Sequence, residues 1–279
     1  MKITSLQITA FARHLHEEER SGGTIEKYLR DVGAFVRWLE GRPVTKEAAA
    51  GWKAHLQAAG YAPTTINSML AALNGLFRFL GCEDCRVKFL KIQRRLFRDP
   101  SRELTRPEYD RLLETARGQG KERLALLMEA ICATGIRVSE ARYLTVEAAQ
   151  AGRAEIALKG KIRTILIPNK LCRKLLKYAK RRKIASGEIF LTRGGTSLSR
   201  KQIWAEMKGL CQRAGVEPGK VFPHNLRHLF ARTYYAQEKD LSRLADVLGH
   251  SSVATTRIYT MESGGIHAKQ LKRMGLVTT

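Results

Sequence analysis

Apolar residues recur at helical spacing along the first 81 positions of the chain. In the clearest stretch they lie three or four residues apart from Ile25 to Leu39, and Gly41 follows soon after the last of them. This spacing puts the apolar side chains on one face of a helix and leaves polar residues on the other. Similar stretches open near residues 3, 45 and 63, so the pattern predicts four short amphipathic helices packed as a bundle. By itself, such a bundle could also be a packing or protein-binding module.

The chain beyond residue 102 mixes helical spacing with short strand-like runs. Capping boxes at Thr105–Glu108 and Ser199–Gln202 mark helix starts at which side chains bond to free backbone N–H groups. The pattern therefore predicts a mainly α fold with a small three-stranded antiparallel sheet inserted. The three strand-like runs occupy residues 153–158, 163–168 and 188–192.

Residues 82–102, between these two regions, have a different composition. They hold seven Lys or Arg residues against three acids, and Asp99-Pro100 breaks any helix that precedes it. A basic, poorly periodic stretch could lie along a phosphate backbone or simply remain solvated. We therefore expect a helical domain at 1–81, a basic linker at 82–102 and a second domain at 103–279.

The formal net charge is +24 and the isoelectric point about 10.2, which favours a polyanionic partner, with nucleic acid ahead of an anionic membrane. Residues 1–81 hold 10 Lys and Arg against 7 Asp and Glu, whereas residues 82–279 hold 40 against 19. The excess thus lies in the linker and the second domain. The basic side chains from which we expect DNA contacts belong to the linker and to a basic helix at 170–183: Arg86, Lys88, Lys91, Arg94, Arg95, Lys174, Lys177 and Arg181.

The five cysteines are an odd number and suggest no secreted disulfide framework. Cys82-x-x-Cys85 has the spacing of a zinc or redox site, but no second Cys or His pair accompanies it, so we expect a surface turn without metal. No apolar run reaches the ~18 residues of a membrane span, and the amphipathic N-terminus does not resemble a signal peptide. The expected location is the cytoplasm, at the bacterial nucleoid, with no membrane partner.

The run from Val221 to Tyr259 contains four side chains suited to phosphoryl chemistry: His224, Arg227, His250 and Tyr259. Attack on a phosphodiester needs an in-line nucleophile, cations on the non-bridging oxygens and a proton for the leaving oxygen. A tyrosine hydroxyl has a pKa of about 10 and needs a base or a positive pocket nearby. Arginine can hold two phosphate oxygens and keeps its charge. We therefore expect Tyr259 to attack a DNA phosphodiester, although each of these residues alone has a structural explanation.

Five short motifs occur in order along the second domain: ATGIRVSE at 133–140, KGK at 159–161, HNLR at 224–227, LGH at 248–250, and Tyr259. Together they resemble the catalytic domain of the tyrosine recombinase/integrase family over residues 103–279. Residues 1–81 resemble the family's SAM-like core-binding domain more loosely, in helix count, size and position. Because the chain starts at this bundle, without an additional N-terminal module, it looks most similar to Xer-like recombinases or small mobile-element integrases.

The resemblance implies how the scissile phosphate would be held. Arg137 and Arg227 would clamp it, and His250 would hydrogen-bond to it. Glu140 lies one helical turn after Arg137 and would hold that guanidinium. Members of the family cleave and rejoin duplex DNA at specific recombination sites without metal, other cofactor or ATP. They bind a site as dimers and form tetramers in synapsis.

The resemblance also implies the proton transfers. Tyr259 would form a 3′-phosphotyrosyl link, while His224 would position the phosphate and accept the tyrosine proton. Lys159 would donate a proton to the leaving 5′ oxygen. The family hairpin usually has two residues between its lysines, whereas Gly160 alone separates Lys159 from Lys161 here. Either lysine could therefore be the general acid, and the family spacing favours Lys159.

The second half of the run from Val221 to Tyr259 also resembles a helix-turn-helix. Residues 244–249 would form the first helix and the turn, and 251–258 the second helix, with Thr255 and Arg257 facing bases. A non-catalytic DNA-binding protein of this kind is the main alternative, but it leaves the HNLR and ATGIR motifs unexplained. A scaffold for RNA or an anionic membrane would rest on net charge alone.

Overall fold

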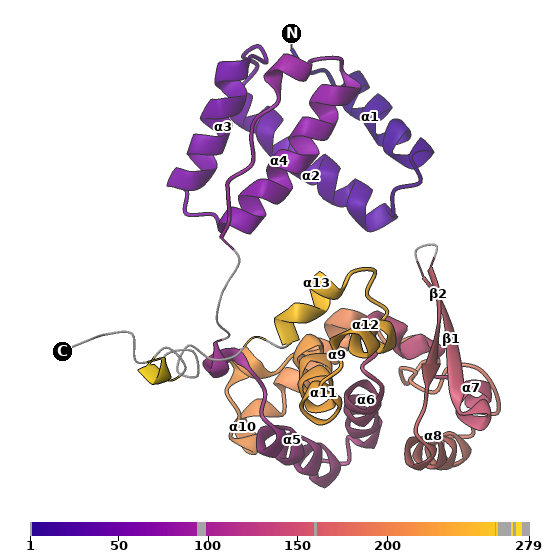
Figure 1. Cartoon of the computed structure of the whole chain (residues 1–279). Helices are drawn as coiled ribbons and strands as arrows, with labels where there is room; N and C mark the ends of the chain where they lie inside the picture. The colour runs from indigo at the N-terminus through magenta and orange to yellow at the C-terminus, as the bar shows by residue number, and fades with distance from the viewer. Residues whose placement is uncertain are drawn as a thin grey trace. The chain divides into compact units, whose positions relative to one another are not determined.

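The computed structural model describes residues 2–93, 99–158, 161–259, 261, 269 and 272–274, apart from the side chains of residues 158 and 161. The chain divides into two compact units, Met1–Arg94 and Arg95–Thr279 (Figure 1). Both units are built largely from helices around their own apolar cores, and the second also contains a β-hairpin. None of the described helices combines the length and apolar character that crossing a membrane requires.

The first unit is a bundle of the four helices that the apolar spacing predicts. Capping sets two of the helix starts, since Thr4 and Gln7 form a capping box at α1 and Thr45 caps α3. Aromatic side chains fill the core, where Phe35 and Phe77 meet edge to face with ring centroids 6.0 Å apart. The helices are α1 (Ser5–Glu17), α2 (Gly22–Leu39), α3 (Lys46–Ala58) and α4 (Pro63–Phe79).

The segment that follows α4 and the short 3-10 helix η1 (Glu83–Cys85) continues to pack on the first unit. The side-chain amide of Asn74 pairs with both backbone groups of Val87, at 2.9 and 3.0 Å. The amide of Asn67 pairs in the same way with Leu90, at 2.9 and 2.7 Å. An amide that donates and accepts at once imitates a neighbouring strand, so this segment is held against α4.

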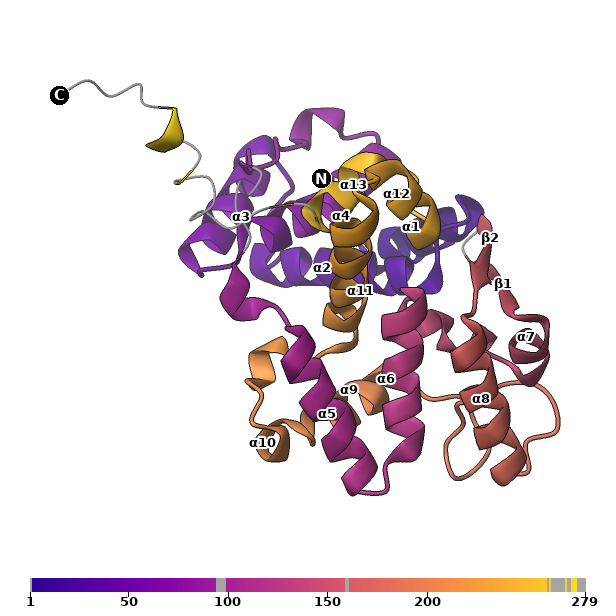
Figure 2. The same ribbon diagram turned by 60° about the horizontal axis from the view of Figure 1, so that its bottom comes forward.

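The second unit is organised around α6 (Glu122–Thr134), whose buried residues lie on most of its circumference. Figure 2 shows α6 between α5 (Arg106–Gly118) and α8 (Asn169–Arg181), and α11 (Pro223–Glu238) also packs against it. Further helices of this unit are η2 (Pro100–Arg102), η3 (Val138–Tyr143), α7 (Val146–Ala151), α9 (Arg200–Lys208), α10 (Cys211–Ala214), η4 (Pro218–Lys220), α12 (Leu241–Leu248), α13 (Val253–Thr256) and η5 (Arg257–Tyr259).

The sheet is smaller than the sequence predicts. In the residues that the structure describes, β1 (Arg153–Leu158) and β2 (Lys161–Leu166) form a two-stranded antiparallel sheet. The third strand predicted at 188–192 is wrong, because isolated bridges replace it. Ile189 is buried in the core of the unit, and its N–H donates to the Leu144 carbonyl at 3.2 Å. This segment is therefore bound to the turn before α7 rather than to the hairpin.

Candidate active site

Arg227 lies in the first turns of α11 and is only 2% exposed. Its guanidinium donates to the carbonyls of Gly135 and Leu248, the latter at 2.7 Å, which lie at the ends of α6 and α12. Burial, followed by the charge of Arg137, lowers the pKa of Arg227 to about 10, whereas the nearby Tyr259 hydroxyl acts in the opposite direction. A buried cation held by two carbonyls is oriented before any anion arrives.

Gly135 makes the turn that aims its carbonyl at Arg227. It ends α6 with a φ of 66°, in the left-handed region. A Cβ at this position would lie 2.4 Å from the ring of Phe230, so a side chain has no room here. The glycine of the ATGIR motif therefore stops α6 and brings Arg137 to the site two residues later.

Arg137 is anchored on one side and open on the other, since its side chain is 41% exposed. Glu140, which is 1% exposed, accepts from Arg137 Nη1 at 3.0 Å and from the Arg137 backbone N–H at 2.7 Å. Arg163, on β2, pairs with the same carboxylate. Glu140 thus fixes the guanidinium of Arg137 while leaving part of it accessible to an incoming anion.

His250 follows α12 and bonds to both of its polar neighbours. Arg227 Nη2 donates to His250 Nε2 at 3.0 Å, and His250 Nδ1 lies 2.9 Å from the buried Thr256 Oγ1. Burial, followed by Arg227 and Arg137, lowers the pKa of His250 to about 4, so the ring is neutral at pH 7. In a neutral ring that accepts at Nε2, Nδ1 carries the proton and donates it to Thr256.

Tyr259 ends η5 and is 5% exposed. Its ring stacks on that of His250, with centroids 6.0 Å apart and planes at 11°. The position is thus enclosed beside both His250 and Arg227. Tyr259 also belongs to a small apolar cluster that contains Ala231, Leu244 and Leu248.

Two histidines on successive turns of α11 complete the surroundings of Tyr259. The ring centroid of His228 lies 4.5 Å from that of His224 and 4.7 Å from that of Tyr259, edge to face in both cases. Desolvation, followed by Arg227, lowers the pKa of His224, and burial lowers the pKa of His228 to about 3. Both rings are therefore neutral at pH 7, and His224, at the exposed start of α11, can accept a proton.

A cavity of about 620 Å³ opens beside these groups. Arg137, His224 and Arg227 line one part of it, and Arg200 and Lys201 at the start of α9 add further positive charge. Such a wall suits a phosphate ester, because the charged oxygens can meet the cations while the sugar lies against apolar groups. The apolar lining comes from Ile136, Val138, Trp204, Phe222 and Pro223.

A metal centre has little support in the described parts of the chain, which contain no group of three or more suitable ligands. Cys82 and Cys85 are half-buried at η1 and pack against the first unit's core. Arg137, Arg200, Lys201 and Arg227 line the cavity, and their positive charge disfavours a metal ion there. What this arrangement can bind is an anion.

The two lysines predicted as alternative general acids are Lys159 and Lys161. Lys159 is outside the described residues, and only the backbone of Lys161, at the start of β2, is described. Their assignment to the leaving oxygen stays a prediction.

Comparison with known proteins agrees with these motifs. Residues 102–264 match the phage integrase family, and residues 8–83 match the N-terminal SAM-like domain of phage integrases. The chain belongs to the phage integrase family of tyrosine recombinases. It is therefore a DNA breaking-and-rejoining enzyme.

Curated relatives cover most of this recombinase. Tyrosine recombinase XerA of Pyrococcus furiosus is 33% identical over 280 residues, which span 97% of this chain and 93% of the relative. Tyrosine recombinase XerC of Roseiflexus castenholzii is 31% identical over 282 residues, spanning 91% and 88%. The similarity thus extends through both units.

Solved structures share the recombinase fold. A lambda integrase dimer bound to a COC′ core site has a TM-score of 0.75 at 18% identity, covering 94% of this chain and 96% of that one. The XerH recombinase bound to difH has a TM-score of 0.70 at 21% identity, covering 94% and 83%. At these identities the likeness concerns the fold alone.

Sequence reasoning missed three residues of the recombinase site: Arg163, His228 and Thr256. His228 lies one helical turn after His224, and that spacing was an available signal. Arg163 lies two residues before the buried Ile165, so the strand period places both side chains on the same, inward face. Thr256 has no comparable signal in the sequence.

The basic residues predicted to contact DNA are distributed unevenly. Lys88, Lys91 and Lys177 are exposed, whereas Arg94 and Arg95 lie outside the described residues. Arg86, Lys174 and Arg181 each pair with an acid, namely Glu83, Glu129 and Glu122. A phosphate would have to compete with these acids for the three paired cations.

The helix-turn-helix alternative concerns α12 and α13. The second of these helices has four residues, about one turn, and Thr256 within it is buried under His250. It runs directly into the 3-10 helix η5, and a segment this short, with Thr256 turned to His250, is not the exposed recognition helix that lies along a major groove. The pair of helices instead carries His250 and Tyr259 to Arg227.

Proposed function

We propose that this recombinase acts on a specific recombination site in duplex DNA, with Tyr259 as its nucleophile. The observation that carries the proposal is the meeting of three motifs: Arg227 bonds to His250 at 3.0 Å, and the His250 ring stacks on Tyr259. These residues lie on three different elements, α11, the turn after α12, and η5. A nucleophile placed beside an oriented cation is the arrangement that attack on a phosphodiester needs.

Arg137 and Arg227 hold the non-bridging oxygens of the scissile phosphate. Arg137 presents its open side, and Arg227 has N–H groups beyond those bonded to Gly135, Leu248 and His250. His250 accepts from Arg227 in the DNA-free form. The negative phosphate favours its protonated form, in which Nε2 donates to a phosphate oxygen.

The covalent step exchanges one phosphate ester for another. The Tyr259 oxygen forms a bond to phosphorus as the bond from phosphorus to the 5′ oxygen breaks, and the tyrosine proton passes to neutral His224. Lys159, or Lys161 in its place, gives a proton to the departing 5′ oxygen. Rejoining reverses these transfers with a 5′ hydroxyl as the nucleophile. Because one ester replaces another, ATP is not required, and the two arginines supply the charge stabilisation for which other enzymes use metal ions.

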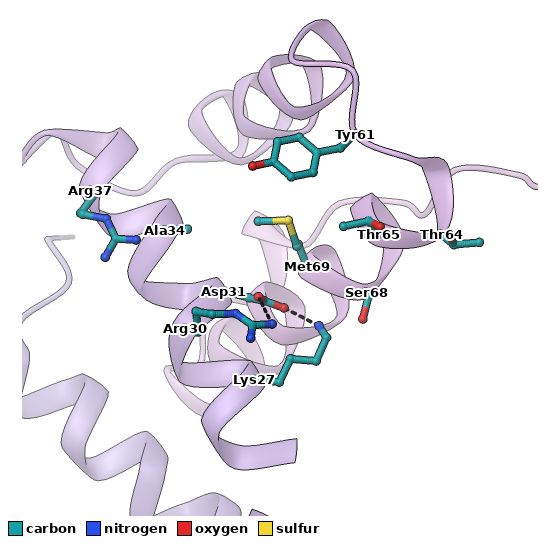
Figure 3. Close-up of a pocket in the computed structure, with 10 residues that line it drawn as sticks. All are labelled: Lys27, Arg30, Asp31, Ala34, Arg37, Tyr61, Thr64, Thr65, Ser68 and Met69. Carbon is teal, nitrogen blue, oxygen red and sulfur yellow. Dashed lines mark hydrogen bonds and ion pairs between the residues drawn. The ribbon is translucent and has the colours of Figure 1, made fainter. Parts of the chain in front are cut away.

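The N-terminal helical domain, with proposed limits at 1–81 before a linker at 82–102, holds the DNA duplex. Figure 3 shows a hollow between α2 and α4 in which Lys27 and Arg30 meet at Asp31. Its volume is about 570 Å³, and Arg37 also lines it. Hydroxyls and cations arranged in this way suit backbone phosphates. The hydroxyls come from the first turns of α4, at Thr64, Thr65 and Ser68.

The protein assembles on its DNA as a dimer at each site and as a tetramer when two sites meet. Solved structures with the same fold support this, because lambda integrase is seen as a dimer on a core site and as a tetramer on a Holliday junction. With DNA as the substrate, its place in a bacterial cell is the nucleoid.

A trapping experiment tests the nucleophile. A duplex is selected from a randomised pool by its binding, and is then nicked so that the cleaved strand loses a short fragment and cannot be resealed. We expect a covalent adduct that protease destroys, formed by the wild type and by Tyr234→Phe but not by Tyr259→Phe. Tyr234 packs on the same apolar cluster and controls for its packing. An adduct with Tyr259→Phe would assign the nucleophile elsewhere.

A further inference from the structure

Arg163 lies where three parts of the second unit meet. It is on β2, paired across the hairpin with Ile156, and its side chain is 15% exposed. Its partners are Glu140, 23 positions before it, and the carbonyl of Val247, 84 positions after it. Neither partner belongs to the hairpin, so the arginine joins the hairpin to two separate segments of the site.

The first contact reaches Arg137. The Glu140 carboxylate is almost fully buried, and it bonds to the Arg137 backbone, to Arg137 Nη1 and to Arg163. A buried carboxylate needs compensating charge, and Arg137 is 41% exposed, so the enclosed Arg163 is the steadier of its two cations. Without Arg163, Glu140 would lose that partner and its hold on Arg137 would loosen.

The second contact reaches His250. Arg163 Nη1 donates to the Val247 carbonyl at 3.2 Å, near the end of α12. Its stem lies on Gly249, where a Cβ would come within 2.5 Å of Arg163 Cδ. Gly249 has a φ of 63° and stands between Leu248, whose carbonyl accepts from Arg227, and His250. The arginine thus packs on the turn that sets the direction of the His250 ring.

We propose that Arg163 is a positioning residue that holds the two halves of the phosphate clamp in register, orienting Arg137 through Glu140 and His250 through the end of α12. This inference rests on the proposed function of Arg137 and His250 at the scissile phosphate. Arg163 itself acts through these neighbours. Loss of comparable orienting partners around other reactive groups lowers activity about 10–100-fold.

The test compares three variants on three versions of the selected duplex. Arg163→Ala removes the side chain, Arg163→Met keeps the stem on Gly249 without the charge, and Arg163→Lys keeps a charge without the fork that reaches two partners. One duplex carries the normal scissile phosphate. The second has a methylphosphonate there, which removes the charge that the clamp neutralises, and the third has a bridging sulfur, which needs no proton to leave.

We expect single-turnover cleavage of the normal duplex to fall about 10–100-fold in Arg163→Ala and Arg163→Met, and less in Arg163→Lys. The ratio of the wild-type cleavage rate to the variant rate should be smaller on the methylphosphonate duplex, since an uncharged centre depends less on the clamp. On the bridging-sulfur duplex this ratio should be the same as on the normal duplex. Equal losses of cleavage rate on all three duplexes would mean that Arg163 contributes only to the general stability of the fold. Rescue by sulfur would assign it to the leaving group. Either result overturns the proposal.

Arg123→Ala is the matched control. Arg123 is also largely enclosed and also holds one carboxylate and one carbonyl, those of Glu206 and Leu191. Arg123→Ala is expected to change thermal stability about as much as Arg163→Ala does. Its cleavage rate relative to wild type should be the same on all three duplexes. If Arg163→Ala fails to fold, Arg163→Met and Arg163→Lys decide the matter. A wild type that cleaves none of the duplexes would refute the proposed function, whereas full cleavage by the folded Arg163 variants would refute only this inference.

Discussion

The two units of the chain differ in how far their functional polar side chains are exposed. In the second unit, Glu140, Arg227 and Thr256 are 1%, 2% and 0% exposed, and each is bonded to another part of the site. In the first unit, the cations around the hollow stand at the surface, with Arg30 72% exposed beside the buried Asp31. The candidate site of the second unit thus contains buried, bonded charges, whereas the hollow of the first unit is surrounded by more exposed cations.

This difference assigns the units different tasks. Charges that are buried and bonded to one another are oriented before the substrate arrives, so they influence the rate of a chemical step. Surface charges are mobile and screened by salt, so they influence affinity. Substitutions of the buried charges at the second unit's site should therefore change cleavage, and those around the hollow should change binding.

The largest effect is expected from the clamp. Arg227→Ala and Arg137→Ala should each reduce single-turnover cleavage roughly 10²–10³-fold, by analogy with the loss of one oxyanion donor. Only Arg227→Ala should also lower the free energy of unfolding, by about 1–3 kcal/mol, because it leaves the buried carbonyls of Gly135 and Leu248 without their donor. Quenched-flow cleavage and urea denaturation measure the two quantities.

The control is Arg213→Ala, which removes the same charge from an exposed position on α10. It should leave both quantities near those of wild type. Cleavage by Arg227→Ala at the rate of this control would remove Arg227 from the clamp.

A smaller effect, on thermal stability, is expected when the pH is lowered. The folded-state pKa of His250, about 4, lies below its ordinary value of 6.5, so the unfolded chain takes up a proton first as pH falls. The stability due to neutral His250 is complete above about pH 6.5 and is lost as pH falls toward 4. Melting temperatures between these pH values should drop more steeply for wild type than for His250→Asn.

His16→Asn, at an exposed position on α1, should leave that pH dependence unchanged. Parallel curves for wild type and His250→Asn would mean that His250 is not held neutral by its burial and its arginine neighbours.

The smallest effect is expected at the hollow of the first unit. Arg37→Ala should weaken DNA binding a few-fold, to a similar extent on all sequences, and should reduce the slope of log affinity against log salt by about 1. Cleavage of bound DNA should not change. Arg13→Ala, on the exposed side of α1, provides the comparison, and titrations at several salt concentrations measure the slope. A change in cleavage rate without a change in slope would contradict the division between the units.

Local sequence signals predicted most of the helices. The Thr105–Glu108 and Ser199–Gln202 capping boxes both form, and Gly135 and Gly249 end their helices in the left-handed region. Each depends on residues within one or two turns, which is why the sequence alone reveals them. The prediction of a third strand at 188–192 was wrong because the burial of Ile189 in the distant core determines which backbone groups this segment bonds to.

The sequence identified most residues of the candidate site but not the contacts that hold them in place. Motif order named Arg137, Arg227, His250 and Tyr259, yet the carbonyls that orient Arg227 lie 92 and 21 positions from it. Contacts between residues so far apart in the chain leave no periodic pattern in the local sequence. Arg163 was missed for the same reason, since its two partners come from opposite sides of it in the chain.

The enclosure of Tyr259 has a consequence for the DNA while it is cut. A phosphotyrosyl ester that water reaches is lost by hydrolysis, and the enzyme has no energy source with which to reseal the resulting end. Tyr259 is 5% exposed and rests among Ala231, Leu244 and Leu248. Under the proposed mechanism, an ester formed on Tyr259 starts from a position with little water, which favours rejoining of the strand over hydrolysis of the ester.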